Sequence, residues 1–254
     1  MIRLEDVRLT LGGSEVLKGV SLDLDKGGTG VILGASGSGK TTILRVILGL
    51  YKPSSGHVFV NGGELTGMME EDLYRLRGEM GMVFQGGALF DSLTVGENVG
   101  YRLKERREDA VEIERRVRKS LSFVDLEDAI DLMPAELSGG MKKRVAIARG
   151  FVAGPKILLY DEPTAGLDPI NANNVAILIN KLRAEGVTSV VVTHDLTCAF
   201  AVATKIAFIH EGVIVYVGGK EGLLKSTDDR VRDFMALAGC LPGFAKATDE
   251  ILGL

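Results

Sequence analysis

The residues with the clearest chemistry lie in a glycine-rich segment, Gly34–Thr41, which fits the pattern GxxxxGK[ST] in full. This segment follows an apolar stretch and precedes residues with helical spacing, the context that this phosphate-binding motif requires. Glycines let backbone N–H groups point inward around a phosphate, and a helix start adds a positive dipole. Lys40 would bring a positive charge to the β- and γ-phosphates, and the Thr41 hydroxyl can ligate Mg²⁺. The predicted phosphate-binding residues are Gly34, Ala35, Ser36, Gly37, Ser38, Gly39, Lys40, Thr41 and Thr42.

Two further apolar stretches end in side chains that complement such a loop. Residues 157–160 lead into Asp161 and Glu162, and residues 190–193 lead into His194. Since ligands of parallel α/β sheets bind beyond the carboxyl ends of the strands, these side chains are expected at the same edge as the loop. There, Asp161 can hold Mg²⁺, Glu162 can orient or deprotonate an attacking water, and a neutral His194 can bond the γ-phosphate or that water. The alternatives are solvated loop carboxylates and a helix-capping or merely exposed histidine.

A second candidate anion site lies at Leu137–Met141, which reads LSGGM and precedes residues with helical spacing. Ser138 is a favourable N-cap residue, and Gly139 and Gly140 leave the amide groups of the first turn uncovered. Exposed amides at a helix start attract anions. An ordinary capped helix is the alternative, and the spacing alone does not say whether both glycine-rich segments face one nucleotide.

The order of the expected elements indicates an α/β fold. Alternating polar and apolar residues over 3–11 and 16–25 predict neighbouring antiparallel strands, and the apolar run within 29–33 predicts a buried strand. A helix is expected over 40–50. Further strands are expected over residues 57–60, 156–160, 190–193, 206–209 and 213–217, the last two as a hairpin around Glu211 and Gly212.

The middle of the chain has a different pattern. Residues 102–119 carry eight basic and five acidic side chains in mixed order, which predicts a solvated helix face rather than a nucleic-acid-binding stripe. Residues 137–152 predict a second helix. A helical insert over roughly 87–152 therefore interrupts the α/β core, and the tail from Lys220 has an amphipathic helical pattern.

Composition narrows the possible classes of protein. The chain has 254 residues, of which 46% are apolar and 25% charged, so it has enough apolar surface to fold. A net charge of −4 argues against a strongly basic nucleic-acid binder. Cys198 and Cys240 are far apart, which supports neither a disulfide framework nor a zinc site. No run of 18 apolar residues and no signal peptide is visible, so any membrane role is expected to come through a partner.

Taken together, the motifs resemble those of the ATP-binding cassette (ABC) ATPases over nearly the whole chain. In that family two cassettes pair head to tail, so the resemblance implies that Ser138, Gly139 and Gly140 face the nucleotide held by the other chain. It also implies that Gln85 touches Mg²⁺, senses the transporter subunit and takes part in catalysis, and that Asp168 crosses the dimer seam. The ordered set that carries the resemblance is Gly34–Thr41, Gln85, Leu137–Met141, Asp161-Glu162, Asp168 and His194.

The resemblance implies a P-loop NTPase of the α/β class, with a RecA-like core, a mostly parallel sheet, an N-terminal antiparallel β subdomain and a helical insert. We expect residues 1–86 and 153–219 to form the nucleotide-binding core, residues 87–152 the helical subdomain and residues 220–254 a C-terminal helical extension. ATP and Mg²⁺ are the implied cofactors, with Thr41, Gln85 and Asp161 at the metal. Two positions depart from the family: Leu11 stands where an aromatic often stacks on adenine, and Met141 where many cassettes have glutamine.

Finer features resemble the Mla-type cassettes of bacterial phospholipid transport, whose permeases work with MCE proteins. They imply phospholipid cargo, an integral-membrane permease and a small regulatory subunit as partners, and a peripheral location on the cytoplasmic face of the bacterial inner membrane. The segments concerned are residues 85–90 with 93–99, residues 132–136, residues 168–170 and residues 229–234. Because the chain holds one cassette, the resemblance to the ABC family implies a homodimer of cassettes or a pair with a similar subunit.

Other functions are left open by these motifs. The same cassette could serve an amino-acid or metal importer, and the co-purifying permease would discriminate between these cargoes. A soluble cassette acting on DNA or ribosomes usually has a long coiled-coil insertion or two cassettes in one chain, and neither occurs in this sequence. A P-loop kinase conflicts with the LSGG segment, and no NKxD-like sequence supports a GTPase.

Overall fold

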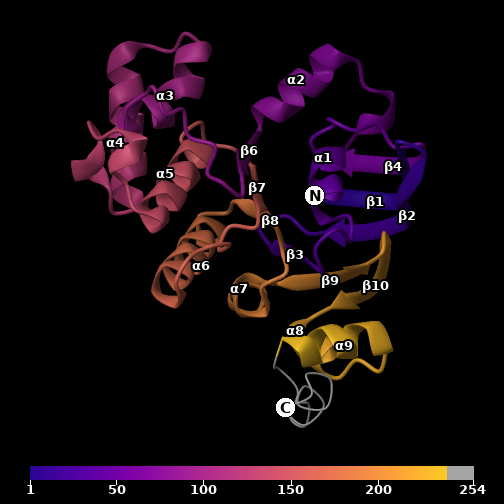
Figure 1. The fold of residues 1–254 in the computed structure, drawn as a ribbon. Coiled ribbons are helices and arrows are strands. Elements are labelled where there is room, and N and C mark those ends of the chain that lie inside the picture. Colours follow the sequence, from indigo (N-terminus) through magenta and orange to yellow (C-terminus); the bar gives the residue numbers. More distant parts are fainter. Residues whose placement is uncertain (239–254) are drawn as a thin grey trace.

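The computed structural model describes residues 1–238, which form two β-sheets and the helices that cover them (Figure 1). The strands are β1 (Ile2–Leu11), β2 (Ser14–Leu24), β3 (Thr29–Leu33), β4 (Ser55–Val60), β5 (Gly63–Glu64), β6 (Met80–Val83), β7 (Ile157–Asp161), β8 (Thr188–Thr193), β9 (Lys205–His210) and β10 (Val213–Gly218). The helices are α1 (Lys40–Ile47), α2 (Glu70–Gly78), α3 (Val95–Glu105), α4 (Ala110–Phe123), α5 (Gly139–Phe151), α6 (Pro169–Ala184), α7 (Leu196–Val202), α8 (Lys220–Leu224) and α9 (Asp229–Leu237). Short 3₁₀ turns occupy η1 (Leu65–Gly67), η2 (Glu127–Ala129) and η3 (Pro134–Glu136).

The smaller sheet is antiparallel around β1, with strand order β2-β1-β4-β5. The alternation predicted from the sequence is present, because Leu4 and Leu9 are buried while their neighbours along the strand are exposed. Asn61 and Gly62 both have positive φ angles, 53° and 85°, which suits the tight turn between β4 and β5.

The larger sheet has the order β10-β9-β3-β8-β7-β6 and is parallel except for β10, which pairs antiparallel with β9. The hairpin expected around Glu211 and Gly212 is therefore present. In the parallel register Leu33 pairs with Thr193, and Asp161 pairs with Val192. The carboxyl ends of β3, β7 and β8 consequently lie at one edge of the sheet, which brings the three predicted motif ends together.

The larger sheet separates two hydrophobic cores. Val31 and Leu33 of β3 pack into the core that contains α3–α7, whereas Ile32 packs into the core that contains α1 and the smaller sheet. This alternation follows from the opposite directions of successive side chains along a strand. All three residues have no exposed surface, which explains the near-continuous apolar run in this strand.

The helical segment between β6 and β7 differs from the sequence prediction in one respect. Residues 102–119 are not one helix, because α3 ends at Glu105 and α4 begins at Ala110. The chain reverses at Arg107, whose φ of 56° lies in the left-handed region. Asp109 then caps α4 by accepting from the N–H groups of Val111 and Glu112.

Helix α5 packs closely on the edge of the larger sheet. A Cβ on Gly81 of β6 would lie 2.1 Å from the Gly150 carbonyl oxygen of α5, so this approach requires glycine. The contact holds the helical segment against β6 immediately before the chain reaches Gln85.

The C-terminal part of the described chain packs beside the β9–β10 hairpin (Figure 1). Phe234 of α9 meets Phe208 of β9 with ring centroids 5.0 Å apart. Residues 239–254, the rest of the expected C-terminal extension, lie outside the described residues. Among the helices of residues 1–238, none combines the length and the apolar composition that crossing a membrane requires.

Candidate nucleotide-binding and catalytic site

The glycine-rich loop connects the end of β3 to the start of α1. Gly37 and Gly39 have φ angles of 79° and 107°, a conformation that glycine adopts without strain. Gly34 needs glycine for a different reason, because a Cβ there would lie 2.3 Å from the Ile209 carbonyl oxygen. From the β9–β10 hairpin, the Gly212 N–H donates to the Ser38 carbonyl at 3.0 Å and supports the loop. The Ser38 hydroxyl is buried and has no hydrogen-bond partner, which fits a loop that receives a phosphate oxygen.

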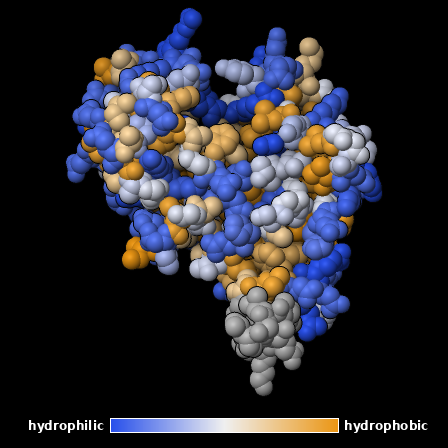
Figure 2. Space-filling view, in the orientation of Figure 1, coloured by the Kyte–Doolittle hydropathy of each residue, from blue (hydrophilic) through white to orange (hydrophobic). Residues whose placement is uncertain are grey.

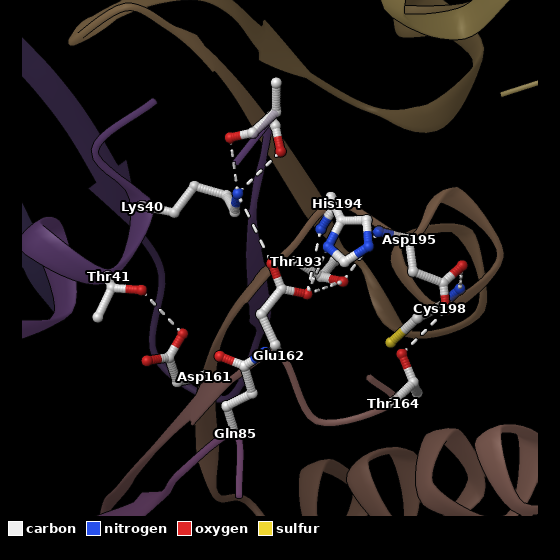
Figure 3. A network of polar contacts seen from close by, with 12 residues as sticks. Lys40, Thr41, Gln85, Asp161, Glu162, Thr164, Thr193, His194, Asp195 and Cys198 are labelled. Carbon is white, nitrogen blue, oxygen red and sulfur yellow. Dashed lines mark hydrogen bonds and ion pairs between the residues drawn. The ribbon is translucent and has the colours of Figure 1, made fainter. Parts of the chain in front are cut away.

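Lys40 is held at the centre of the site. Its Nζ donates to the carbonyl oxygens of Gly34 and Ala35, each at 2.9 Å, and lies 3.6 Å from Glu162 Oε1 (Figure 3). The side chain is only 6% exposed, and burial lowers the pKa of Lys40 against the opposing pull of Glu162. A confined ammonium facing the glycine-rich loop is suited to bind phosphate oxygens.

Thr41 and Asp161 form the second pair. The Thr41 hydroxyl donates to Asp161 Oδ1 at 3.0 Å, so the first turn of α1 is joined to the end of β7 (Figure 3). Burial raises the pKa of the Asp161 carboxyl, with the Thr41 bond acting in the opposite direction. No group of three or more His, Cys, Asp or Glu side chains gathers as a metal cage among the described residues. One carboxylate with one hydroxyl fits Mg²⁺ instead, because this ion usually takes few protein ligands and completes its shell with water and phosphate oxygens.

Glu162 is the most heavily bonded side chain of the site. Its Oε2 accepts from the Thr193 hydroxyl at 3.1 Å and from the His194 N–H at 3.3 Å, and it lies 3.0 Å from His194 Nδ1. Glu162 is 7% exposed and has a φ of 46°, an uncommon left-handed conformation for a glutamate. The turn after β7 thus directs the carboxylate toward the end of β8, as Figure 3 shows.

Gln85 follows β6 and is exposed. Its side chain extends toward Asp161 and Glu162 (Figure 3), while its carbonyl oxygen accepts from Lys143 Nζ of α5. The structure therefore brings together Lys40, Thr41, Gln85, Asp161, Glu162 and His194, all of which were predicted from the sequence.

Two other predicted site residues serve as helix caps in this chain. Ser138 Oγ accepts from the Met141 N–H at 3.2 Å at the start of α5. Asp168 Oδ1 accepts from the N–H groups of Ile170 and Asn171 at 3.0 Å each, at the start of α6, and the bond from the Asn171 N–H is the largest influence lowering the pKa of Asp168. Among the described residues, no hydrogen bond or ion pair joins residues 138–140 to residues 34–42. Their predicted contact with a nucleotide in the partner chain stays a prediction.

Sequence reasoning missed a layer of residues behind Glu162 and His194. Asp195 accepts from the Thr164 hydroxyl at 2.9 Å and caps α7 through the Thr197 and Cys198 N–H groups. Thr193 also belongs to this layer, because its hydroxyl accepts from the Asp195 N–H while donating to Glu162. A signal was available, since a threonine directly before His194 and an aspartate directly after it are suited to such local bonds.

The parallel sheet, the glycine-rich loop and the carboxylates at the ends of neighbouring strands define a P-loop nucleoside triphosphatase. The comparisons narrow this class: the profile of the family described as ABC transporter matches residues 17–165. The chain belongs to the ABC transporter family and is an ATP-hydrolysing, ATP-binding subunit of a transporter. The predicted fold class is thereby confirmed.

Relatives of known function differ in cargo. The chain is 36% identical to the Fe(3+) ions import ATP-binding protein FbpC of Escherichia coli O157:H7, over 99% of this chain and 72% of that protein. It is 38% identical to the intermembrane phospholipid transport system ATP-binding protein MlaF of Escherichia coli (strain K12), over 92% of this chain and 88% of that protein. A dimeric structure of the ATP-binding cassette MJ0796 bound to ADP and Pi is similar with a TM-score of 0.79 and 33% identity, covering 86% of this chain and 98% of that one.

Proposed function

We propose that two copies of this chain hydrolyse ATP between them and thereby power an Mla-type permease that transports phospholipid. The observation that carries the catalytic part is the position of Glu162, whose carboxylate is held by Thr193 and His194 beside the Lys40 ammonium. This group is fixed at the edge of the sheet where the phosphate loop opens, which is where a water attacking the γ-phosphate has to be oriented.

Binding of the triphosphate is assigned to residues 34–42, with Lys40 and the helix start of α1 neutralising its charge. Thr41 and Asp161 would hold Mg²⁺, with Gln85 as a further ligand, and the ion would neutralise charge on the β- and γ-phosphates when bound. Lys40 now bonds two carbonyl oxygens of its own loop, so an entering phosphate would replace those acceptors. Replacing Lys40 with alanine is expected to weaken nucleotide binding itself, as measured by titration, and unchanged affinity would contradict the assignment.

Glu162 and His194 are assigned to the reaction itself. An ionised Glu162 can only accept a hydrogen bond, so the proton of its 3.0 Å contact with His194 lies on Nδ1. In a neutral imidazole this leaves Nε2 as an acceptor facing away from Glu162. The carboxylate can then orient or deprotonate the attacking water, while Nε2 accepts a hydrogen bond from that water. A bond from the imidazole to the γ-phosphate, whose oxygens only accept, requires a proton on Nε2 instead.

The head-to-tail dimer is supported by the exposed start of α5. Ser138 and Gly139 are exposed, and they make no hydrogen bond or ion pair with the phosphate loop of their own chain within residues 1–238. A solved structure of the similar cassette MJ0796, which is dimeric and bound to ADP and Pi, supports a dimer as the active form. The second phosphate site of each nucleotide would thus come from the partner chain, and Asp168 would lie at the seam.

The dimer is tested by light scattering in a Glu162→Gln background, which is expected to retain bound ATP because hydrolysis is slowed. Ser138→Arg is expected to abolish ATP-driven dimers while sparing ATP binding by the single chain. Ser122→Arg, on an exposed face of α4, is the matched control and should leave the dimers intact. Normal dimers of Ser138→Arg would exclude the proposed shared nucleotide site.

A groove beside Gln85 supports the permease as partner. Its volume is about 440 Å³, and Asn98 holds one wall by bonding both the N–H and the carbonyl of Phe90. Figure 2 shows a hollow between the side that carries α3–α5 and the side that carries α2, with apolar side chains at its base. The groove offers partly exposed aromatic side chains with charged groups beside them, a pattern suited to an amphipathic segment of a partner. These side chains are Phe84, Phe90, Tyr101, Arg102, Glu105 and Arg149.

Phospholipid as cargo is supported by the Mla-like segments of the sequence and by the similarity to MlaF. We also propose the corresponding location, peripheral on the cytoplasmic face of the inner membrane, and the division of the chain into a core, a helical subdomain over 87–152 and a C-terminal extension. Purification of the chain with its permease from native membranes, followed by lipid analysis, tests the cargo. Co-purification with an iron or amino-acid permease would replace phospholipid with that cargo, as the similarity to FbpC allows.

A further inference from the structure

Lys143 is a buried cation that belongs to the helical segment but binds the main chain at two points of the catalytic site. It lies on α5 and is 6% exposed. Its Nζ donates to the carbonyl oxygen of Gln85 and, at 3.2 Å, to the carbonyl oxygen of Glu162. One ammonium thus joins the segment after β6 to the turn after β7.

A second cation of the same helix binds the same segment further along. Arg149 donates to the carbonyl oxygens of Gly87 and Ala88 at 2.8 and 2.7 Å, and it also lines the groove proposed for the permease. Helix α5 therefore holds residues 85–88 through three carbonyl oxygens. Of these two cations, Lys143 is the one that also bonds the main chain of Glu162.

The burial of Lys143 is costly, because a cation removed from water is compensated only in part by neutral carbonyl oxygens. Burial lowers the pKa of Lys143, while the nearby Asp161 and Glu162 charges oppose that change. A residue that served only to fill this space could be apolar, so the ammonium is better explained by the two carbonyl oxygens that it fixes. Both belong to residues whose side chains lie at the proposed nucleotide site (Figure 3).

We propose that Lys143 is a positioning residue for ATP hydrolysis, which fixes the backbone at Gln85 and Glu162 together so that movement of α5 changes the rate of hydrolysis rather than the affinity for ATP. The inference rests on the proposed catalytic role of Glu162. A movement of the groove proposed for the permease would displace Arg149 and with it α5. Lys143, on the same helix, would then displace the main chain at Glu162. A misplacement of about 1 Å at a reacting group can cost about 10²-fold in rate, so a main-chain clamp is sufficient for such control.

The test compares steady-state ATP hydrolysis and nucleotide binding by the full-length chain and its variants. Lys143→Met keeps much of the side-chain volume but removes both bonds, and it is expected to lower kcat about 10- to 100-fold while the KM for ATP stays within about twofold. Lys143→Arg retains a cationic donor and is expected to recover most of the lost kcat. Lys142→Met is the matched control, because the neighbouring side chain takes part in no hydrogen bond or ion pair within residues 1–238, and its kcat should be unchanged.

Thermal unfolding of each variant separates positioning from folding. If Lys143→Met does not fold, Lys143→Gln, which keeps a neutral donor, takes its place in the same measurements. An unchanged kcat in a folded variant, or a raised KM with unchanged kcat, would overturn the proposal. So would an Arg variant that folds normally but is as slow as the Met variant. Failure of the underlying catalytic assignment looks different: Glu162→Gln would then hydrolyse ATP as fast as the wild type.

Discussion

The main-chain N–H and the imidazole Nδ1 of His194 both meet one carboxylate oxygen of Glu162, at 3.3 and 3.0 Å. The Thr193 hydroxyl supplies a third contact to the same atom, so the end of β8 fixes the carboxylate that follows β7. The other oxygen, Oε1, faces Lys40 at 3.6 Å. Glu162 is therefore anchored through one oxygen, while the other faces the phosphate-loop lysine.

Glu162→Gln tests this division of roles. The amide oxygen of glutamine can still accept from Thr193 and His194, but the side chain can no longer accept a proton from water. Turnover is expected to fall about 10²- to 10⁴-fold with ATP binding retained, as measured by phosphate release and nucleotide titration. Undiminished hydrolysis would remove Glu162 from the mechanism.

Gly140→Ala and Gly139→Ala form a matched pair at the start of α5. A Cβ on Gly140 would lie 2.2 Å from Asn171 Oδ1, whereas a Cβ on Gly139 would lie 3.9 Å from its nearest neighbour, Leu167. The first change must displace Asn171, which bonds Asp168 at 2.5 Å, and should cost about 1–3 kcal/mol in the free energy of unfolding. Urea unfolding measures both variants. Equal stabilities would show that Asn171 moves aside without cost.

Adding Asn171→Ala to Gly140→Ala should recover part of that loss, because the obstructing side chain is then absent. A double-mutant cycle measures the recovery as a coupling free energy between the two positions. If the two losses in the free energy of unfolding are strictly additive, the cost of Gly140→Ala does not come from its contact with Asn171.

Asp161 predicts a particular pH dependence of stability without nucleotide. Its folded pKa is raised by burial and, to a smaller extent, by the neighbouring Glu162 charge, so the folded chain binds this proton more tightly than the unfolded chain, whose pKa is near 3.8. Below both pKa values this group therefore does not change the free energy of unfolding. As pH rises from 3.8 through the folded pKa, its ionisation lowers the free energy of unfolding. Asp161→Asn should remove this loss and raise the free energy of unfolding at neutral pH.

Urea unfolding of wild type and Asp161→Asn from about pH 4 to about pH 8 checks the sign. The difference between the two proteins should grow with pH and then level off. A difference that shrinks with rising pH would mean that favourable contacts of the ionised carboxylate outweigh its burial.

Cys198 should be unreactive in the folded chain. It is 3% exposed, and burial, its largest influence, raises the pKa of the thiol to about 12, so only about 10⁻⁴ of it is thiolate near pH 8. In a Cys240→Ser variant, an alkylating reagent should modify the protein only after urea unfolding. Rapid modification of the folded protein would show that α7 opens readily.

The sequence was informative where a motif and an element boundary coincide. Lys40, Asp161 and His194 could be placed at one edge because each follows an apolar strand, and parallel strands end at the same side. Hydrogen bonds between residues far apart in the sequence left no such signal. Lys142 and Lys143 are adjacent lysines, yet only Lys143 is buried against Gln85 and Glu162. The cap role of Asp168 was accessible, since aspartate directly before Pro169 is typical of a helix start. The chain reversal at Arg107 could not be predicted, because the pattern of mixed charges continues across this residue.

The alternation within β3 also bears on how such a protein can change over time. Val31 and Ile32 are chain neighbours, but they belong to cores on opposite faces of one sheet. Substitutions in the core that contains α3–α7 can therefore change the surface that binds a membrane partner. The core that contains α1 can meanwhile keep the packing that positions Lys40. Diversity of transported cargo and constancy of the chemical step can thus coexist in a single chain of this size.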